Sequence, residues 1–259
     1  MRRLPRLLLV LLLAAGAGPA WVGVSGAVSL GGDWRTASRA SAGLAPDPAQ
    51  VRAPVVQVYA ARAWSWRGLF AVHTWIATKR RDAAAFTVHE VLGWRARQGR
   101  PVVVSRVDLP DRHWYAAAPV LLADRRGAGV EAMIDAIEAA VADYPHAHRY
   151  GLWPGPNSNT FVAWVTRAVP ALAVELPATA IGKDYLADGA LLARAPSGGG
   201  VQFSLAGLFG VLVAPREGFE LNLLGLVFGL DALPPALKLP GAGRIGAQPR
   251  PAVAPLPGP

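Results

Sequence analysis

The sequence contains 259 residues, of which 53% are hydrophobic and 17% are charged, and its formal net charge is +9. A chain of this length and apolar content can bury one sizeable core, so a wholly disordered protein is excluded. The complete absence of cysteine excludes disulfides, thiol catalysis and every cysteine-containing zinc site.

The first predicted element is an N-terminal export segment, residues 1–32. Three arginines precede the apolar run Leu7–Leu13, and no charged residue follows until Asp33; the arginines are Arg2, Arg3 and Arg6. This pattern is typical of a signal peptide or a transmembrane anchor, and both alternatives remain open. By the positive-inside rule, we expect a protein anchored in the inner membrane and facing the periplasm, or a periplasmic protein after signal cleavage. Nucleic acid is therefore not an expected partner, although Lys79-Arg80-Arg81 is a basic cluster.

Residues 33–54 are rich in Ala, Ser and Pro and predict a linker. A single α+β domain is expected over residues 55–245, with an antiparallel sheet and a few packed helices. Its first strand is predicted at Val55–Arg62, where β-branched and aromatic residues are frequent. Further β-structure is predicted at Phe86–Leu92 and Pro101–Asp108.

The segment Trp66–Thr78 predicts a strand with two different faces. Successive strand residues point to opposite sides, so His73 and Trp75 share one face. The other face carries the set expected to point into the core: Phe70, Val72, Thr74 and Ile76.

Two helices are predicted. In Val130–Ala142 the apolar residues recur with helical spacing and form one face: Val130, Met133, Ile134, Ile137 and Val141. A second helix is predicted from Ser158 to about Arg167, because Val169-Pro170 ends a helical pattern.

Residues 170–245 are expected to form a β-rich extension. The apolar runs Ser204–Ala214 and Leu221–Leu230 are too short to cross a bilayer as helices. They predict either a β-hairpin or a surface that leans on a membrane. The Pro- and Gly-rich residues 246–259 predict a disordered tail.

The candidate site is the segment Asn157-Ser158-Asn159, where a small hydroxyl side chain stands at a helix start. Free backbone N–H groups and the helix dipole favour negative charge there. The pattern predicts Ser158 as a nucleophile and His73 as its general base, with His89 or Glu90 as the residue that orients His73; His89 is preferred. Asn157 and Asn159 could assist in stabilising an oxyanion.

A simpler interpretation stays open for each of these residues. Asn and Ser are preferred N-cap residues, so the segment is also what a helix cap alone requires. A single histidine on a strand is usually a half-buried core residue. Trp75, close to His73, and Trp153, close to Ser158, flank the candidate site and are candidates for the wall of a pocket. No cofactor and no metal site is expected, since His146-Ala147-His148 lacks nearby carboxylates at ligand spacing.

The stretch Tyr150-x-Leu152-(x4)-Asn157-Ser158-Asn159-Thr160-Phe161 resembles a motif of the circularly permuted papain-like hydrolases and acyltransferases, which include the lecithin–retinol acyltransferase branch. Those proteins carry Tyr-x-Leu, a short spacer and Asn-Cys-x-x-Phe at a helix start. Their histidine lies earlier, on a strand, often as His-x-x-Ile/Leu, which His73-Thr74-Trp75-Ile76 matches. Some members place a second polar residue on the next strand, the position of His89. The resemblance covers residues 55–169, implies a permuted papain-like core there, and adds Tyr150 to the binding residues.

The whole chain also resembles a bacterial family, the domain of unknown function 3750. This second resemblance rests on four stretches: residues 33–38, 73–77, 153–161 and 238–241. It implies no activity.

The chain departs from the permuted papain-like pattern at the reactive position, where Ser158 stands in place of cysteine. A thiol ionises readily beside histidine, whereas a serine hydroxyl must lose its proton during attack. Two functions are therefore expected as alternatives. One is an envelope-associated hydrolase or acyltransferase that acts on an amide or ester through Ser158 and His73. The other is a catalytically inactive domain that binds a cell-envelope component, either peptidoglycan peptide or lipid. The oligomeric state is left undetermined by the sequence.

Overall fold

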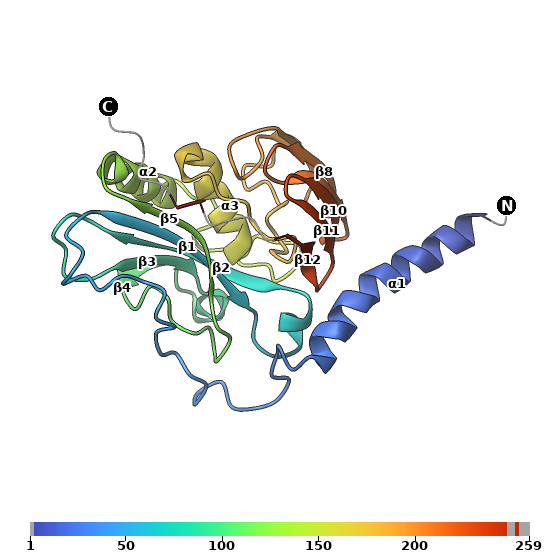
Figure 1. Ribbon diagram of the computed structural model, residues 1–259, viewed down its shortest axis with the longest axis horizontal. Coiled ribbons are helices and arrows are strands. Elements are labelled where there is room, and N and C mark those ends of the chain that lie inside the picture. Colours follow the sequence, from blue (N-terminus) through green and yellow to red (C-terminus); the bar gives the residue numbers. More distant parts are fainter. Residues whose placement is uncertain (1–2, 248–251, 254–259) are drawn as a thin grey trace.

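Two β-sheets and three α-helices form the framework of the residues that the structure describes (Figure 1). The structure is a computed structural model, and it describes residues 3–247 and 252–253. It confirms the predicted α+β class with antiparallel sheets and few helices. Most of the predicted tail, residues 246–259, lies outside the described residues.

The first sheet contains six strands in the order β13 (Ala252–Val253), β5 (Val120–Arg126), β1 (Val55–Arg62), β2 (Val72–Lys79), β3 (Thr87–Val91) and β4 (Val103–Val107). Neighbouring strands are antiparallel except β13, which runs parallel to β5. Short 3₁₀ helices accompany the strands and helices: η1 (Ser65–Leu69), η2 (Gly93–Gln98) and η3 (Pro170–Leu172).

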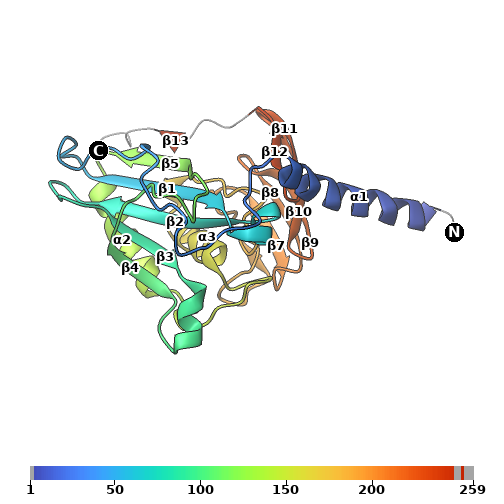
Figure 2. The same cartoon turned by 90° about the horizontal axis from the view of Figure 1, so that it is seen from below.

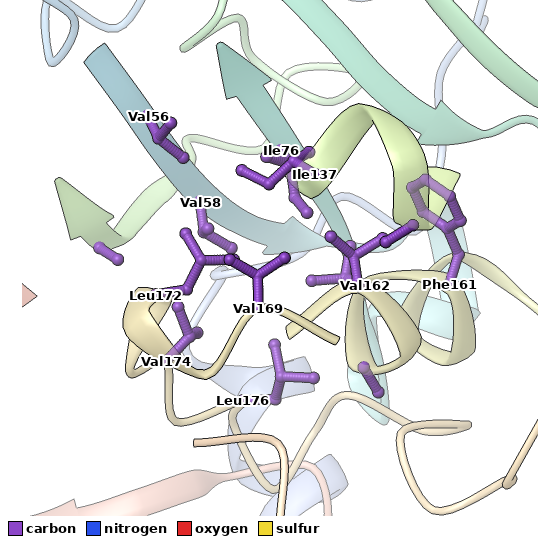
Figure 3. Packing of buried hydrophobic residues seen from close by; sticks show 14 of the residues in the cluster. Val56, Val58, Ile76, Ile137, Phe161, Val162, Val169, Leu172, Val174 and Leu176 are labelled. Carbon is purple, nitrogen blue, oxygen red and sulfur yellow. The ribbon is translucent and has the colours of Figure 1, made fainter. Parts of the chain in front are cut away.

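Helices α2 (Val130–Ala142) and α3 (Ser158–Ala168) cover one face of this sheet (Figures 1 and 2). Alternate residues of β1 and β2 point toward them and form the main core (Figure 3), among them Val56, Val58 and Ile76. Both helices have the predicted positions because their apolar residues recur on one side. This face of the sheet is therefore the one on which α3 places its N-terminus.

The opposite face of the first sheet carries a second core of large aromatic residues. Tyr59 and Trp75 are fully buried there and pack with Trp114 from the segment after β4. The segment predicted as a linker contributes to this layer, since Val51 packs against the cluster and Ser41 forms a β-bridge with Arg112. Residues 33–54 contain no helix or strand beyond that bridge, yet part of the segment is fixed to the domain.

The N-terminal helix α1 (Arg3–Val24) projects away from the rest of the molecule (Figures 1 and 2). Its C-terminal half touches the remainder of the chain at η1 and at the strand β11 described below. Within residues 3–247 and 252–253, no helix combines the length and the apolar character needed to cross a membrane.

The second sheet lies beyond α3, next to α1, and is called the C-terminal sheet below (Figure 1). It contains seven strands in sequence order: β6 (Leu192–Ala193), β7 (Val201–Leu205), β8 (Phe209–Ala214), β9 (Gly218–Leu223), β10 (Leu226–Ala232), β11 (Pro235–Leu239) and β12 (Gly243–Gly246). All neighbours are antiparallel. The predicted single hairpin is thus part of a larger meander, in which each of the two apolar runs contains a turn of its own.

Candidate functional site

The start of α3 is built as a helix cap. The side chain of Asn157 accepts hydrogen bonds from the backbone N–H groups of Asn159 and Thr160. The Thr160 hydroxyl in turn accepts a hydrogen bond from the Asn157 N–H at 3.1 Å, which completes a capping box. The Asn157 amide also donates to the carbonyls of Leu152 and Ile181. The capping interpretation of the sequence is therefore confirmed for Asn157.

Replacing Asn157 with alanine is expected to lower the free energy of unfolding by about 2 kcal/mol, because it removes the cap and leaves two carbonyls without their donor. Urea denaturation measures the change. Ser158→Ala is the matched control, and it should change the value by less than about 0.5 kcal/mol. Equal losses in the two variants would contradict the structural role of Asn157.

Asn159 holds α3 against the first sheet. Its Oδ1 accepts a hydrogen bond from the Thr74 hydroxyl at 2.9 Å, and its Nδ2 donates to the carbonyls of Val72 and Ile181. Both polar atoms of the Asn159 side-chain amide, Oδ1 and Nδ2, thus have hydrogen-bond partners within the protein. Asn159 is therefore a structural clamp and is not placed to stabilise an oxyanion.

Ser158 and His73 lie on opposite faces of the first sheet. Thr74 points toward α3, where its hydroxyl lies 3.4 Å from the Ser158 carbonyl oxygen. Its neighbour His73 points the other way, as the alternation along a strand requires, and its ring stacks on Trp114. The predicted pairing of Ser158 with His73 is thus not formed, because the sheet itself separates the two side chains. The Ser158 hydroxyl makes no hydrogen bond within the described part of the chain.

His73 belongs to a buried polar cluster on the face away from α3. Its Nε2 lies 3.3 Å from Glu90 Oε2, and its ring stacks on Trp114 with centroids 3.6 Å apart. Burial lowers the pKa of His73 more than the Glu90 carboxylate raises it. Burial also tends to raise the pKa of Glu90, but the hydrogen bond from His73 and the charge of Arg112 hold it below its usual value. The cluster is a neutral imidazole beside an ionised carboxylate.

His89 does not orient His73, because it points to the α3 side of the sheet. Its Nε2 lies 3.1 Å from the Thr78 hydroxyl and its Nδ1 lies 2.8 Å from the Ser105 hydroxyl. Burial lowers the pKa of His89 to about 4, so the ring is neutral at pH 7. The residue that bonds to His73 is instead Glu90, the alternative that the sequence offered beside His89.

The three aromatic residues predicted to bind ligand lie in different places. Trp75 is fully buried on the His73 face, and its indole N–H donates to the Pro110 carbonyl at 2.7 Å. Trp153 is exposed near the C-terminal sheet and donates to the Leu224 carbonyl. Tyr150 packs its ring over Gly93, where any side chain would collide with it. They do not form a common pocket around Ser158.

A cavity of about 150 Å³ opens above the His73 cluster. Aromatic and charged side chains line it: Arg39, Leu92, Trp94, Arg106, Asp108, Arg112, His113, Trp114 and Tyr115. The sequence analysis missed these residues. One local signal was available, because Arg112-His113-Trp114-Tyr115 places a cation beside aromatic rings directly after the β4 region.

Arg112 is the central charged group of the cavity wall. Its side chain is 6% exposed, and its Nη2 donates to Glu90 Oε1 at 2.7 Å. Its Nη1 lies 3.4 Å from Asp108 Oδ2 but makes no hydrogen bond. Arg106 contacts the same two carboxylates, at 2.9 Å from Glu90 and 2.7 Å from Asp108. The wall therefore contains a buried donor with unused hydrogen-bonding capacity.

Within the described residues, no group of three or more His, Asp or Glu side chains could hold a metal ion.

A comparison with protein families matches residues 53–185 to the family described as "Protein of unknown function (DUF3750)". The chain belongs to this family. The matched region spans more than half of the 259 residues and includes β1 to β5, α2, α3 and every cavity-lining residue except Arg39. The C-terminal sheet of this DUF3750 protein lies outside it. No curated protein and no solved structure matches the chain.

Proposed function

We propose that this DUF3750 protein is an envelope-associated binding protein whose core, although similar in motif to permuted papain-like enzymes, carries no catalytic Ser–His pair. The ligand is a carboxylate-bearing envelope component, for which the stem peptide of peptidoglycan is the chemical model. The observation that carries the proposal is the buried Arg112 guanidinium, which lines an aromatic cavity and leaves Nη1 without a hydrogen bond.

The charges around the cavity favour an anionic ligand. Arg106 and Arg112 pair with the two carboxylates of Asp108 and Glu90, and Arg39 adds a third guanidinium group to the wall, so a positive charge remains. Guanidinium groups bind carboxylates through charge-assisted hydrogen bonds. A volume of about 150 Å³ suits the end of a peptide better than a whole saccharide.

The proposed place of action is the periplasmic side of the inner membrane, with the N-terminal segment as anchor or cleaved signal. The supporting pattern is the arginine-rich start followed by the apolar run Leu7–Leu13. In this proposal Ser158 is a helix residue beside the Asn157 cap and has no nucleophilic role.

Arg39→Ala is expected to weaken binding of a soluble peptidoglycan stem peptide about tenfold, because it removes one charge-assisted contact. Isothermal titration calorimetry on the full chain measures the dissociation constant. Arg35→Ala is a matched control, since Arg35 lies over Trp34 much as Arg39 lies over Tyr115 but does not line the cavity.

Ser158→Ala should bind the peptide as the unmodified chain does. Absence of binding by the unmodified chain would refute the proposal. Cleavage of the peptide by the unmodified chain, abolished in Ser158→Ala, would replace it with the hydrolase alternative.

A further inference from the structure

The C-terminal sheet buries many polar side chains on its inner side, where β8 contributes apolar ones, and it exposes apolar side chains on its outer side. The inward-facing residues of its strands include Gln202, Glu220, Asn222, Asp231 and Lys238, all of which are buried. The outward-facing residues alternate with them and are apolar in every strand from β7 to β12. A water-facing sheet has the reverse pattern. The outward surface is called the apolar face below.

The apolar face is continuous from one edge of the sheet to the other. Strand pairing places six apolar residues in one row across six strands: Val201, Val213, Phe219, Leu230, Leu237 and Ile245. A parallel row joins five more: Leu192, Phe203, Val211, Leu221 and Phe228. None of the outward-facing residues in the described part of β7 to β12 is charged. Soluble surfaces rarely expose an apolar patch of this extent.

Helix α1 projects from the side of the molecule on which the apolar face lies (Figures 1 and 2). Its base is fixed to the sheet, because Gly18 packs against the backbone of Pro240 and Ala242. Along its length it exposes further apolar side chains, among them Leu9, Leu12 and Leu13. Arg6, near the start of the helix, is exposed. The residues that follow it, as far as Gly32, are all uncharged. The helix and the sheet thus each expose apolar side chains, and the far end of the helix carries a cationic residue.

We infer that the apolar face rests on a lipid bilayer, with α1 as the adjoining contact. A bilayer can accept a broad apolar sheet face and a projecting apolar helix at the same time. A second copy of the chain is a poorer occupant, since two sheets stacked face to face approach within about 10 Å and the projecting α1 stands in the way. The inference concerns a different surface from the cavity and does not depend on the ligand proposed for it.

The absence of cysteine allows a direct test in the full chain. Single-cysteine variants Leu230→Cys, on the apolar face, and Val107→Cys, on β4, carry an environment-sensitive fluorophore; both positions are exposed, at 60% and 71%. The protein is mixed with vesicles of phosphatidylethanolamine and phosphatidylglycerol that contain nitroxide-labelled lipid. The fluorophore at residue 230 should be quenched by the lipid nitroxide, and that at residue 107 should be quenched only by aqueous iodide.

Each other outcome overturns the inference. If the chain binds vesicles while iodide quenches both labels equally, then α1 attaches the chain to the membrane and the apolar face does not contact the bilayer. If the label at residue 230 is shielded from iodide in the absence of vesicles, and the molecular mass of the protein in solution is that of a dimer, then a second copy of the chain covers the apolar face. If the chain does not bind vesicles, both the face and the proposed anchor fail, whereas the peptide titration above is unaffected.

A charge on the apolar face should weaken vesicle binding. Leu230→Glu together with Phe219→Glu, which are cross-strand neighbours, is expected to lower the partition coefficient about tenfold or more. The matched control, Val107→Glu with Leu109→Glu, changes two residues that are equally exposed but distant from the C-terminal sheet, and should leave the coefficient unchanged. Equal partitioning of the two double variants would refute the inference.

Discussion

Lys238→Met is expected to lower the free energy of unfolding by about 3 to 5 kcal/mol, the usual cost of removing one partner from a buried ion pair. The Lys238 ammonium is 1% exposed and lies 2.6 Å from Glu175, 2.9 Å from Glu220 and 3.1 Å from Asp231. Burial by itself would raise the pKa of Glu220, but Lys183 and Lys238 hold it below its usual value. Without Lys238, the carboxylates of Glu175, Glu220 and Asp231 remain buried with too little positive charge beside them to balance their own. Urea denaturation at pH 7 measures the loss.

The matched control is Arg52→Met, which breaks an ion pair at the surface. Arg52 lies 2.6 Å from Asp82, but both side chains are largely exposed, at 82% and 49%. Water screens such a pair, so its loss should leave the free energy of unfolding nearly unchanged. A similar loss in both variants would show that the polar interior of the C-terminal sheet does not depend on Lys238. In the proposed arrangement this interior is what allows the sheet to turn its apolar side outward.

Local patterns predicted most elements of the first sheet and its helices, but the strand predicted at Trp66–Thr78 begins only at Val72, because Ser65–Leu69 forms a 3₁₀ helix. The strand Val55–Arg62 and the helix Val130–Ala142 have the predicted bounds, and the second helix ends one residue later than predicted. Each is defined by information within its own residues: β-branched and aromatic content for the strand, helical periodicity for α2, and a capping box and a following proline for α3. Strand β5 was not predicted, since its exposed Val120 and its terminal Asp124-Arg125-Arg126 give no clean alternation.

The C-terminal sheet was predicted only as a β-rich extension, and its exposed side could not be identified because its alternation is inverted. Sequence patterns identify the buried side of a strand by its apolar residues. In β7 to β12 the apolar side is exposed, and buried ions and amides such as Lys238, Glu220 and Asn222 form the inner side. Their partners are provided by distant segments, for example Glu175 and Lys183, so the pattern has meaning only in three dimensions.

The candidate site shows the same limit. Alternation along β2 correctly placed His73 on the face opposite the core-facing residues. Which face of the sheet α3 covers depends on contacts between residues distant in sequence. Helix α3 packs on the core-facing side, where Asn159 accepts a hydrogen bond from Thr74. A helix packed on the other side would have joined Ser158 to His73. Likewise, the cavity depends on contacts of Arg112 with Glu90 and with Ser41, which are remote in the sequence.

His89 is expected to make the protein less stable in acid. Its pKa is about 4 in the folded chain, lowered by burial, and about 6.5 when unfolded. Between these values the unfolded chain binds more protons, so stability is complete above pH 6.5 and is lost as the pH falls toward 4. The contribution amounts to about 2 kcal/mol from pH 7 to pH 5 and about 3 kcal/mol by pH 4.

The effect is isolated by comparing the unmodified chain with His89→Gln, because other groups titrate in the same range. His73 acts in the same direction, since burial lowers its pKa, whereas the raised pKa values of Asp184 and Glu217 act in the opposite direction. Between pH 4 and pH 7, the free energy of unfolding measured with urea should therefore rise by about 2 to 3 kcal/mol less for His89→Gln than for the unmodified chain. Identical pH dependence in the two proteins would mean that the ring between Thr78 and Ser105 is free to accept a proton in the folded state, and that this part of the sheet is open to water.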